Sequence, residues 1–155
     1  MRPRYPTSEA LLLPALHFAQ HLHGGWLPDA AIADVASILD LAPAKVYGVV
    51  TFYDLFHQRP VGHHRVRVCT NLSCALRGGN EILAAVGGKL GVHEDEVTAD
   101  GRFSYTHFEC LGACEQAPMM MINDRYHGNL TPDTAAAVLA QLETNLDTDL
   151  NKTES

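Results

Sequence analysis

The sequence is poor in cysteine, tryptophan and basic residues, and it contains no long apolar run. Among 155 residues there are four cysteines and one tryptophan, and 11 lysines and arginines stand against 18 acidic residues. The net charge of −7 argues against nucleic acid or an anionic membrane surface as a partner, because no basic surplus is available to neutralise phosphates. The apolar runs are far shorter than the roughly 20 residues that span a bilayer, so we expect no direct membrane insertion.

The N-terminal segment only partly matches a secretory signal. It has two early arginines and a short apolar run, but Glu9 and Pro14 interrupt that run, and no convincing small-residue cleavage site follows. We therefore expect a cytoplasmic chain in a reducing compartment, where disulfides are not the usual role of cysteine. An apolar content of 46% is enough to build a globular core.

Residues 1–60 are predicted to form a small helical unit. The clearest segment is "LPDAAIADVASILDL", in which Ile32, Val35, Ala36 and Leu39 follow the i, i+3, i+4, i+7 spacing of a buried helix face. The aromatic stretch "VVTFYDLF" is predicted either to dock against a partner subunit or to seal the two parts of this chain together. The polar stretch "HQRPVGHH", with its proline and glycine, indicates a linker.

Residues 61–146 are predicted to form an α/β domain. The alternating segment "HRVRVCT" predicts a strand at 65–69, residues 75–91 suit a helix, and "GRFSYTHFEC" predicts a second strand that ends at residue 110. The element order matches a thioredoxin-like α/β sandwich that lacks its first elements.

The remainder of this domain is predicted to be a hairpin followed by a helix. The hairpin turns near Asn123-Asp124, and the helix is capped by Thr131 and runs to about Leu142. Residues 147–155 are polar and are predicted to form a frayed tail.

The four cysteines occur as two pairs, each at the end of a predicted strand. Cys69 ends the first strand and Cys74 is expected in the loop after it, while Cys110 ends the second strand and Cys114 is expected in its own loop. Adjacent parallel strands release their loops at the same sheet edge, so the four thiols are expected to converge if these strands are neighbours. Four thiolates suit either zinc or an iron–sulfur cluster.

The spacings of the pairs, C-x₄-C and C-x₃-C, favour a two-iron, two-sulfide cluster over zinc. Structural zinc sites usually use C-x₂-C knuckles that wrap around one ion, whereas a wider loop fits ligands spread around a larger core. A zinc-stabilised interaction module remains the alternative at this point. A thiol–disulfide enzyme is disfavoured because its redox dithiol would need C-x-x-C at the start of a helix.

The cysteine motifs lie within segments that together resemble a known family. With "GWLPDAAIADVASILDLAPAKVYGVVTFYDLF" and "ECLGACEQAPMMMIND", the chain resembles the thioredoxin-like [2Fe–2S] subunit of respiratory NADH–quinone oxidoreductase (complex I), in its bacterial E-type form, over nearly its whole length. The resemblance implies that one [2Fe–2S] cluster is bound by Cys69, Cys74, Cys110 and Cys114.

The resemblance also implies an electron-transfer role. Such subunits dock on a flavin-containing partner that oxidises NADH, and their cluster exchanges single electrons with that flavin. Related subunits serve NAD-linked hydrogenases and formate dehydrogenases, so the parent complex stays open, although the proportions of the chain favour the respiratory one. A G-x-G-x-x-G fingerprint does not occur in this sequence, so FMN and NAD are expected only on the partner subunit. The implied location is peripheral to the inner membrane, through the complex.

Three charged residues flank the predicted ligands. Glu109 and Glu115 adjoin the second pair, and Arg77 follows the first. Near a cluster, a carboxylate would oppose the added electron and lower the reduction potential, and an arginine would raise it. The alternative is that all three are solvated surface charges.

Overall fold

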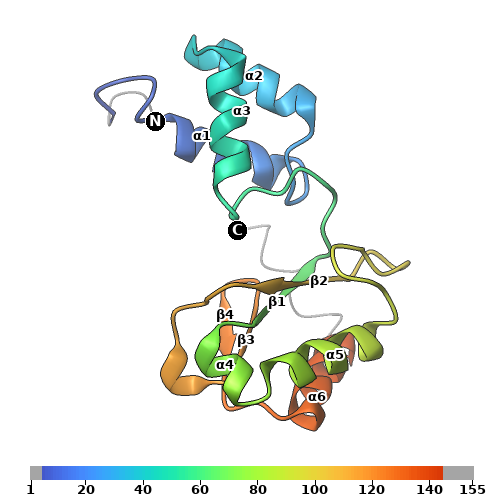
Figure 1. Cartoon of the computed structure of the whole chain (residues 1–155). Coiled ribbons are helices and arrows are strands. Elements are labelled where there is room, and N and C mark those ends of the chain that lie inside the picture. Colours follow the sequence, from blue (N-terminus) through green and yellow to red (C-terminus); the bar gives the residue numbers. More distant parts are fainter. Residues whose placement is uncertain (1–4, 145–155) are drawn as a thin grey trace, which may run out of the picture. The chain divides into compact units, whose positions relative to one another are not determined.

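The computed structural model describes residues 5–144, and the chain divides into two compact units between Val61 and Gly62 (Figure 1). The predicted polar tail at 147–155 lies outside the described residues. In the part of the chain that is described, no helix is both long enough and apolar enough to cross a membrane.

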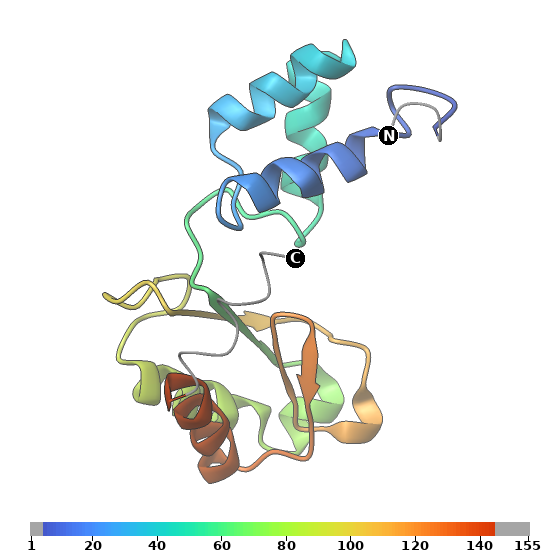
Figure 2. The ribbon, with the colours of Figure 1, turned by 180° about the vertical axis from the view of Figure 1, so that it is seen from behind.

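The first unit contains three helices, α1 (Leu12–Leu22), α2 (Asp29–Leu39) and α3 (Pro43–Phe52) (Figure 2). Pro28 directly precedes α2, and Pro43 is the first residue of α3. An N–H group at the start of a helix has no acceptor within that helix, so proline, which lacks the N–H, costs no hydrogen bond there. The three helices share one apolar core. The predicted apolar face of α2 is confirmed, because its four residues are all buried: Ile32, Val35, Ala36 and Leu39.

A buried glutamine fixes the segment that follows α3. The Gln20 side-chain amide donates to the Leu55 carbonyl at 3.0 Å, and its carbonyl oxygen accepts from the His57 amide at 2.8 Å. These two bonds satisfy both polar ends of a side chain that is only 7% exposed. Residues 53–57 are therefore held against the helices rather than left as free linker.

The second unit contains a four-stranded sheet of order β2-β1-β3-β4. Strands β1 (His64–Cys69) and β2 (Phe103–Phe108) are parallel, so the predicted adjacency of the two strands is confirmed. Strands β3 (Met120–Ile122) and β4 (Arg125–His127) form the predicted hairpin. Its turn contains Asn123 in the left-handed conformation, at φ 51°, which asparagine tolerates better than most residues.

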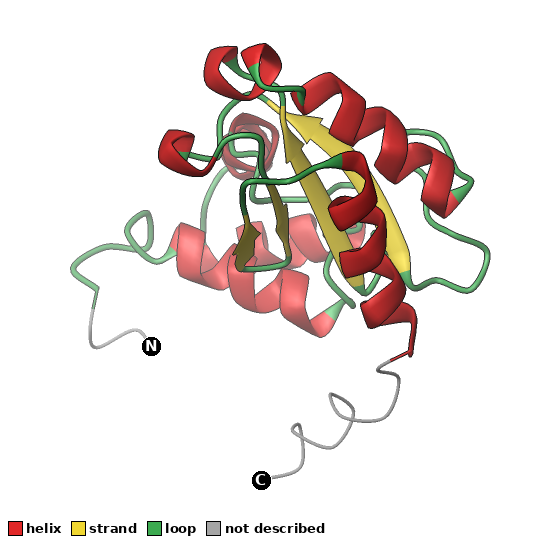
Figure 3. Cartoon of the chain, turned by 90° about the horizontal axis from the view of Figure 1, so that it is seen from below, coloured by secondary structure: helices red, strands yellow, loops and turns green. Residues whose placement is uncertain are grey.

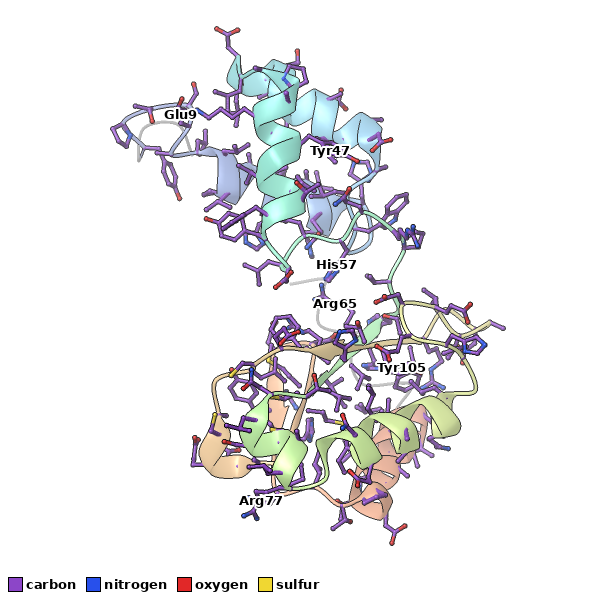
Figure 4. All side chains as sticks on the ribbon, viewed as in Figure 1. Glu9, Tyr47, His57, Arg65, Arg77 and Tyr105 are labelled. Atoms are coloured by element: carbon purple, nitrogen blue, oxygen red, sulfur yellow. The ribbon has the colours of Figure 1, made fainter. Side chains whose placement is uncertain are left out.

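Two helices, α5 (Gly79–Leu90) and α6 (Pro132–Thr144), cover one face of the sheet (Figure 3). Val66 and Val68 of β1 point into this layer and are buried. Tyr105 of β2 points the same way, while Arg65 extends from the opposite face (Figure 4). The predicted last helix is confirmed: Thr131 Oγ1 accepts from the Thr134 amide at 3.2 Å and caps it.

The prediction of one helix at 75–91 is wrong at its start. A five-residue helix, α4 (Leu72–Leu76), comes first, and Gly78 at φ 96° separates it from α5. A side chain at Gly79 would come within 2.9 Å of the carbonyl oxygens of Cys69 and Cys74. Glycine is thus required where the chain turns tightly past both cysteines.

Two adjacent glycines in α5 provide a matched test of this packing. A Cβ at Gly87 would lie 2.5 Å from the buried Tyr105 hydroxyl, whereas one at Gly88 would meet nothing within 4 Å. We expect Gly87→Ala to destabilise the unit by about 1–3 kcal/mol through overpacking, and Gly88→Ala to stabilise it by roughly 0.5–1 kcal/mol through helix propensity. Thermal unfolding of both variants measures the difference.

The double variant Gly87→Ala, Tyr105→Phe is the internal control. It removes the hydroxyl that the new methyl group would meet, so it should unfold at a higher temperature than Gly87→Ala alone. Equal melting temperatures for Gly87→Ala and Gly88→Ala would contradict the packing described here.

Candidate metal centre

The parallel pairing of β1 and β2 brings both cysteine pairs to one edge of the sheet. Cys69 is the last residue of β1 and pairs with Phe108, the last residue of β2. Cys110 follows two residues later, so the prediction that the second strand reaches Cys110 is wrong, although the site of departure is the same sheet edge. The Thr70 amide donates to the Phe108 carbonyl at 3.0 Å and extends the contact beyond the strands.

The other two cysteines lie in short helical segments rather than in loops, which corrects the sequence prediction. Cys74 lies within α4, and Cys114 begins the 3₁₀ helix η2 (Cys114–Gln116). Asn71 caps α4 by accepting from the Leu72 amide at 2.7 Å. The segment "TNLSCAL" contains this capping signal, an asparagine directly before an apolar stretch, although the helix is too short to show a periodic pattern.

The site is buried on one side and open on the other. Cys69 and Cys74 are 3% and 2% exposed, while Cys110 and Cys114 are exposed, and all four are free thiols. The buried pair shares an apolar cluster with four other buried residues: Leu111, Ala113, Ala117 and Met119. Any group held by these sulfurs would be shielded from water on the side of the first pair and accessible from the side of the second.

The four thiols influence one another's acidity. Hydrogen bonding with the Cys74 and Cys110 thiols is among the causes that lower the pKa of Cys69. The charges of Cys69 and Cys114 are among the causes that raise the pKa of Cys74. The Cys69 sulfur lies 4.0 Å from the Glu109 carbonyl oxygen, which is the backbone and not the carboxylate of that residue.

The two buried thiols have pKa values that are shifted in opposite directions. Burial raises the pKa of Cys69, but backbone amides of Leu111 and Asn71 and the two neighbouring thiols outweigh burial and lower it overall. Burial, followed by the bond with Cys69, raises the pKa of Cys74 to about 11. Backbone N–H groups therefore already favour negative charge on one sulfur, as a thiolate-bound metal centre requires.

The donor set fits an iron–sulfur core. Cys₄ ligation is what a [2Fe–2S] cluster takes, with the thiolates divided between two irons. Zinc would instead need its ligands tetrahedrally around one point. Within residues 5–144, no group of three or more His, Cys, Asp or Glu side chains is already arranged as a metal site. The donors available at this sheet edge are two pairs of cysteines from two separate segments.

The charged residues near the cysteines differ in how they are held. Arg77 is tied to the second cysteine segment, because its Nε donates to the Ala117 carbonyl at 2.8 Å. The side chains of Glu109 and Glu115 are exposed. An influence of these charges on a reduction potential stays a prediction.

An ion pair lies just before the second cysteine segment. His107 of β2 contacts Glu94 at 2.6 Å through Nδ1, and its backbone amide donates to the same carboxylate at 3.1 Å. The hydrogen bond with Glu94 raises the pKa of His107, and the same bond lowers the pKa of Glu94. The pair thus braces the end of β2 against the turn at residues 93–96.

This pair predicts a pH dependence of stability. The His107 contribution is complete below its unfolded pKa, near 6.5, and is lost as the pH rises through the higher folded value. The Glu94 contribution is complete above about 4.5 and is lost as the pH falls through the lower folded value. The melting temperature of wild type should therefore exceed that of His107→Gln by most between about pH 4.5 and 6.5. This difference in melting temperature should shrink at alkaline pH. A gap independent of pH would contradict this assignment.

Comparisons with known proteins agree on one family. The family model for thioredoxin-like [2Fe-2S] ferredoxin matches residues 1–143. The chain is 43% identical to the E-type NADH-quinone oxidoreductase subunit of Rickettsia bellii over 141 residues, which covers 90% of this chain and 84% of the relative. It is 39% identical to the mitochondrial NADH dehydrogenase [ubiquinone] flavoprotein 2 of Dictyostelium discoideum, covering 92% of this chain and 58% of that protein.

The fold also occurs in a solved structure. A chain of an NAD⁺-reducing [NiFe]-hydrogenase in the H₂-reduced state superposes with a TM-score of 0.75 at 24% identity. The match covers 93% of this chain but only 24% of the hydrogenase chain, so this protein corresponds to about a quarter of that polypeptide. At this identity the likeness establishes a shared fold.

Proposed function

The chain belongs to the thioredoxin-like [2Fe–2S] ferredoxin family, and on that premise we propose that its four cysteines bind one [2Fe–2S] cluster in an electron-transfer subunit of an NADH–quinone oxidoreductase. The main support is the parallel pairing of β1 and β2, which brings Cys69 and Cys110 to one sheet edge. The names of the relatives support the parent complex.

The two cysteine pairs would hold the proposed cluster from opposite sides. A bound [2Fe–2S] group supplies one-electron redox chemistry. Cys69 and Cys74 would hold it from the buried side, and the apolar residues around them exclude water. Cys110 and Cys114 would hold it from the exposed side, where a redox partner can approach. The amides of Asn71 and Leu111 would donate to the Cys69 sulfur and favour negative charge there.

The partner proposed for this subunit carries both the flavin and the NADH site. The chain has no glycine-rich nucleotide fingerprint, so FMN and NAD are assigned to the partner, and single electrons would pass between its flavin and the cluster. The protein would then lie on the cytoplasmic side, peripheral to the inner membrane through the complex. A role in an NAD⁺-reducing hydrogenase is the second candidate, because the fold recurs there.

The last residue of α3 and the segment after it supply a surface for docking on that partner. Phe52 and Leu55 are 75% and 48% exposed, and Tyr53 contacts Phe52 edge to face with ring centroids 4.9 Å apart. Phe56, by contrast, is buried in the core of the first unit. The bonds of Gln20 to Leu55 and His57 hold this exposed apolar group in a defined shape, as a protein interface requires.

The docking surface predicts a selective loss of affinity. Phe52→Ser should weaken binding to the flavin-containing partner by about tenfold or more, as expected for loss of a buried aromatic anchor. Ile38→Ser, which removes a comparably exposed apolar side chain from α2, should leave binding unchanged. Co-purification and titration of the two proteins measure the effect. Equal behaviour of the two variants would contradict the assignment of this surface.

Cluster content provides the direct test of the proposed function. Anaerobically prepared chain should contain iron and acid-labile sulfide in equal amounts and show visible absorption that dithionite bleaches. Replacement of any one cysteine by serine should lower iron content or shift the spectrum, because a ligand atom changes. Ser73→Ala, next to Cys74 in α4, serves as the control and should retain the wild-type spectrum. A colourless chain with stoichiometric zinc would overturn the proposal.

A further inference from the structure

A tyrosine on the far edge of the sheet reaches the second cysteine segment. Tyr126 lies on β4, paired with Met121 of β3, which is in turn paired with Arg67 of β1. Side chains alternate between the two faces of a strand, and Arg67 lies between Val66 and Val68, which face α5 and α6. The row that contains Arg67, Met121 and Tyr126 therefore lies on the opposite face of the sheet. The Tyr126 hydroxyl donates to the Leu111 carbonyl at 2.9 Å.

Leu111 connects this tyrosine to a predicted cluster ligand. It follows Cys110 directly, is 8% exposed, and packs in the apolar cluster that contains Cys69 and Cys74. Hydrogen bonding from its amide is among the causes that lower the pKa of the Cys69 thiol. Leu111 thus packs beside one predicted ligand, while its carbonyl accepts a hydrogen bond from Tyr126.

The segment around Leu111 needs such an anchor. The next residue, Gly112, has φ 77°, and both Cys110 and Cys114 are exposed. Tyr126 itself is 52% exposed, so its ring adds little to the core compared with a buried aromatic residue. Its hydroxyl bond to the cysteine segment is the contact that distinguishes it from an ordinary surface tyrosine.

We propose that Tyr126 is a positioning residue for the metal centre: by holding the Leu111 carbonyl it fixes the Leu111 amide against the Cys69 sulfur and so raises the reduction potential of the bound cluster. An N–H group directed at a ligand sulfur stabilises the more negative, reduced state more than the oxidised one. The inference rests on the proposed function, because it requires a cluster on these cysteines.

The test is a redox titration of the full chain, loaded anaerobically with iron and sulfide, in wild type and Tyr126→Phe. The phenylalanine variant keeps the ring and removes only the hydroxyl. At a fixed potential its ratio of reduced to oxidised cluster should fall about threefold, the scale of one weakened hydrogen bond, which corresponds to roughly 30 mV at 59 mV per decade. Tyr47→Phe, an exposed tyrosine on α3 of the other unit, is the matched control and should titrate like wild type.

Hydrogen exchange gives a second readout that does not depend on the cluster. In cluster-free protein, Tyr126→Phe should exchange faster at the amides of residues 111–113 and unchanged in α5 and α6. Faster exchange throughout the second unit would indicate a general structural role and overturn the proposal.

The outcomes separate the two proposals. If wild type binds no iron and sulfide, the proposed function fails. If wild type carries the cluster but Tyr126→Phe has the wild-type midpoint and the wild-type electron paramagnetic resonance spectrum, the role of Tyr126 fails while the proposed function stands. A more negative midpoint with an unchanged melting temperature supports the positioning role.

Discussion

Parallel pairing of β1 with β2 is the constraint on which the rest of the molecule depends. Strands that run in the same direction release their following segments at the same edge, so two cysteine pairs far apart in the sequence meet there. An antiparallel arrangement would send the two segments to opposite ends of the sheet. The crossover that parallel pairing requires is supplied by α5, which covers one face of the sheet and packs Val86 and Ile82 against β1 and β2.

One cysteine pair is buried and the other is exposed, an arrangement that suits the proposed one-electron carrier. The first cysteine pair is enclosed in the apolar cluster, which limits solvent access, and the second pair is exposed at the surface. Hydrogen bonding from backbone amides lowers the pKa of the Cys69 thiol. Arg77 and Tyr126 tie the second cysteine segment to neighbouring elements through main-chain carbonyls. Position and hydrogen bonding are the two means by which a protein sets the properties of such a group.

The parts of the fold that follow from local chemistry could be predicted from the sequence. The apolar face of α2, the hairpin at Asn123 and the cap at Thr131 are each specified by a few neighbouring residues. The break between α4 and α5 was missed, because the close approach of Gly79 to the carbonyl oxygens of Cys69 and Cys74 arises from the folded chain and not from a local pattern.

The candidate site likewise has one part that the sequence predicted and one part that it did not. Cysteine spacing and strand alternation predicted that, if the two strands are neighbours, both cysteine segments follow them at one sheet edge, and the parallel pairing of β1 and β2 confirms that the strands are neighbours. The bond from Tyr126 to Leu111 joins two segments that only the folded chain brings together, and no spacing rule links these residues. Likewise, α4 is held in place by its Asn71 cap and by burial of Cys74, and at five residues it is too short to show periodicity.

The most direct measurement for the central claim is anomalous diffraction at the iron absorption edge from crystals of anaerobically prepared protein. Two adjacent iron sites are expected at the carboxyl edge of β1 and β2, with sulfur ligands contributed by both cysteine segments. Iron bound by only one segment, or a single metal ion surrounded by all four sulfurs, would contradict it.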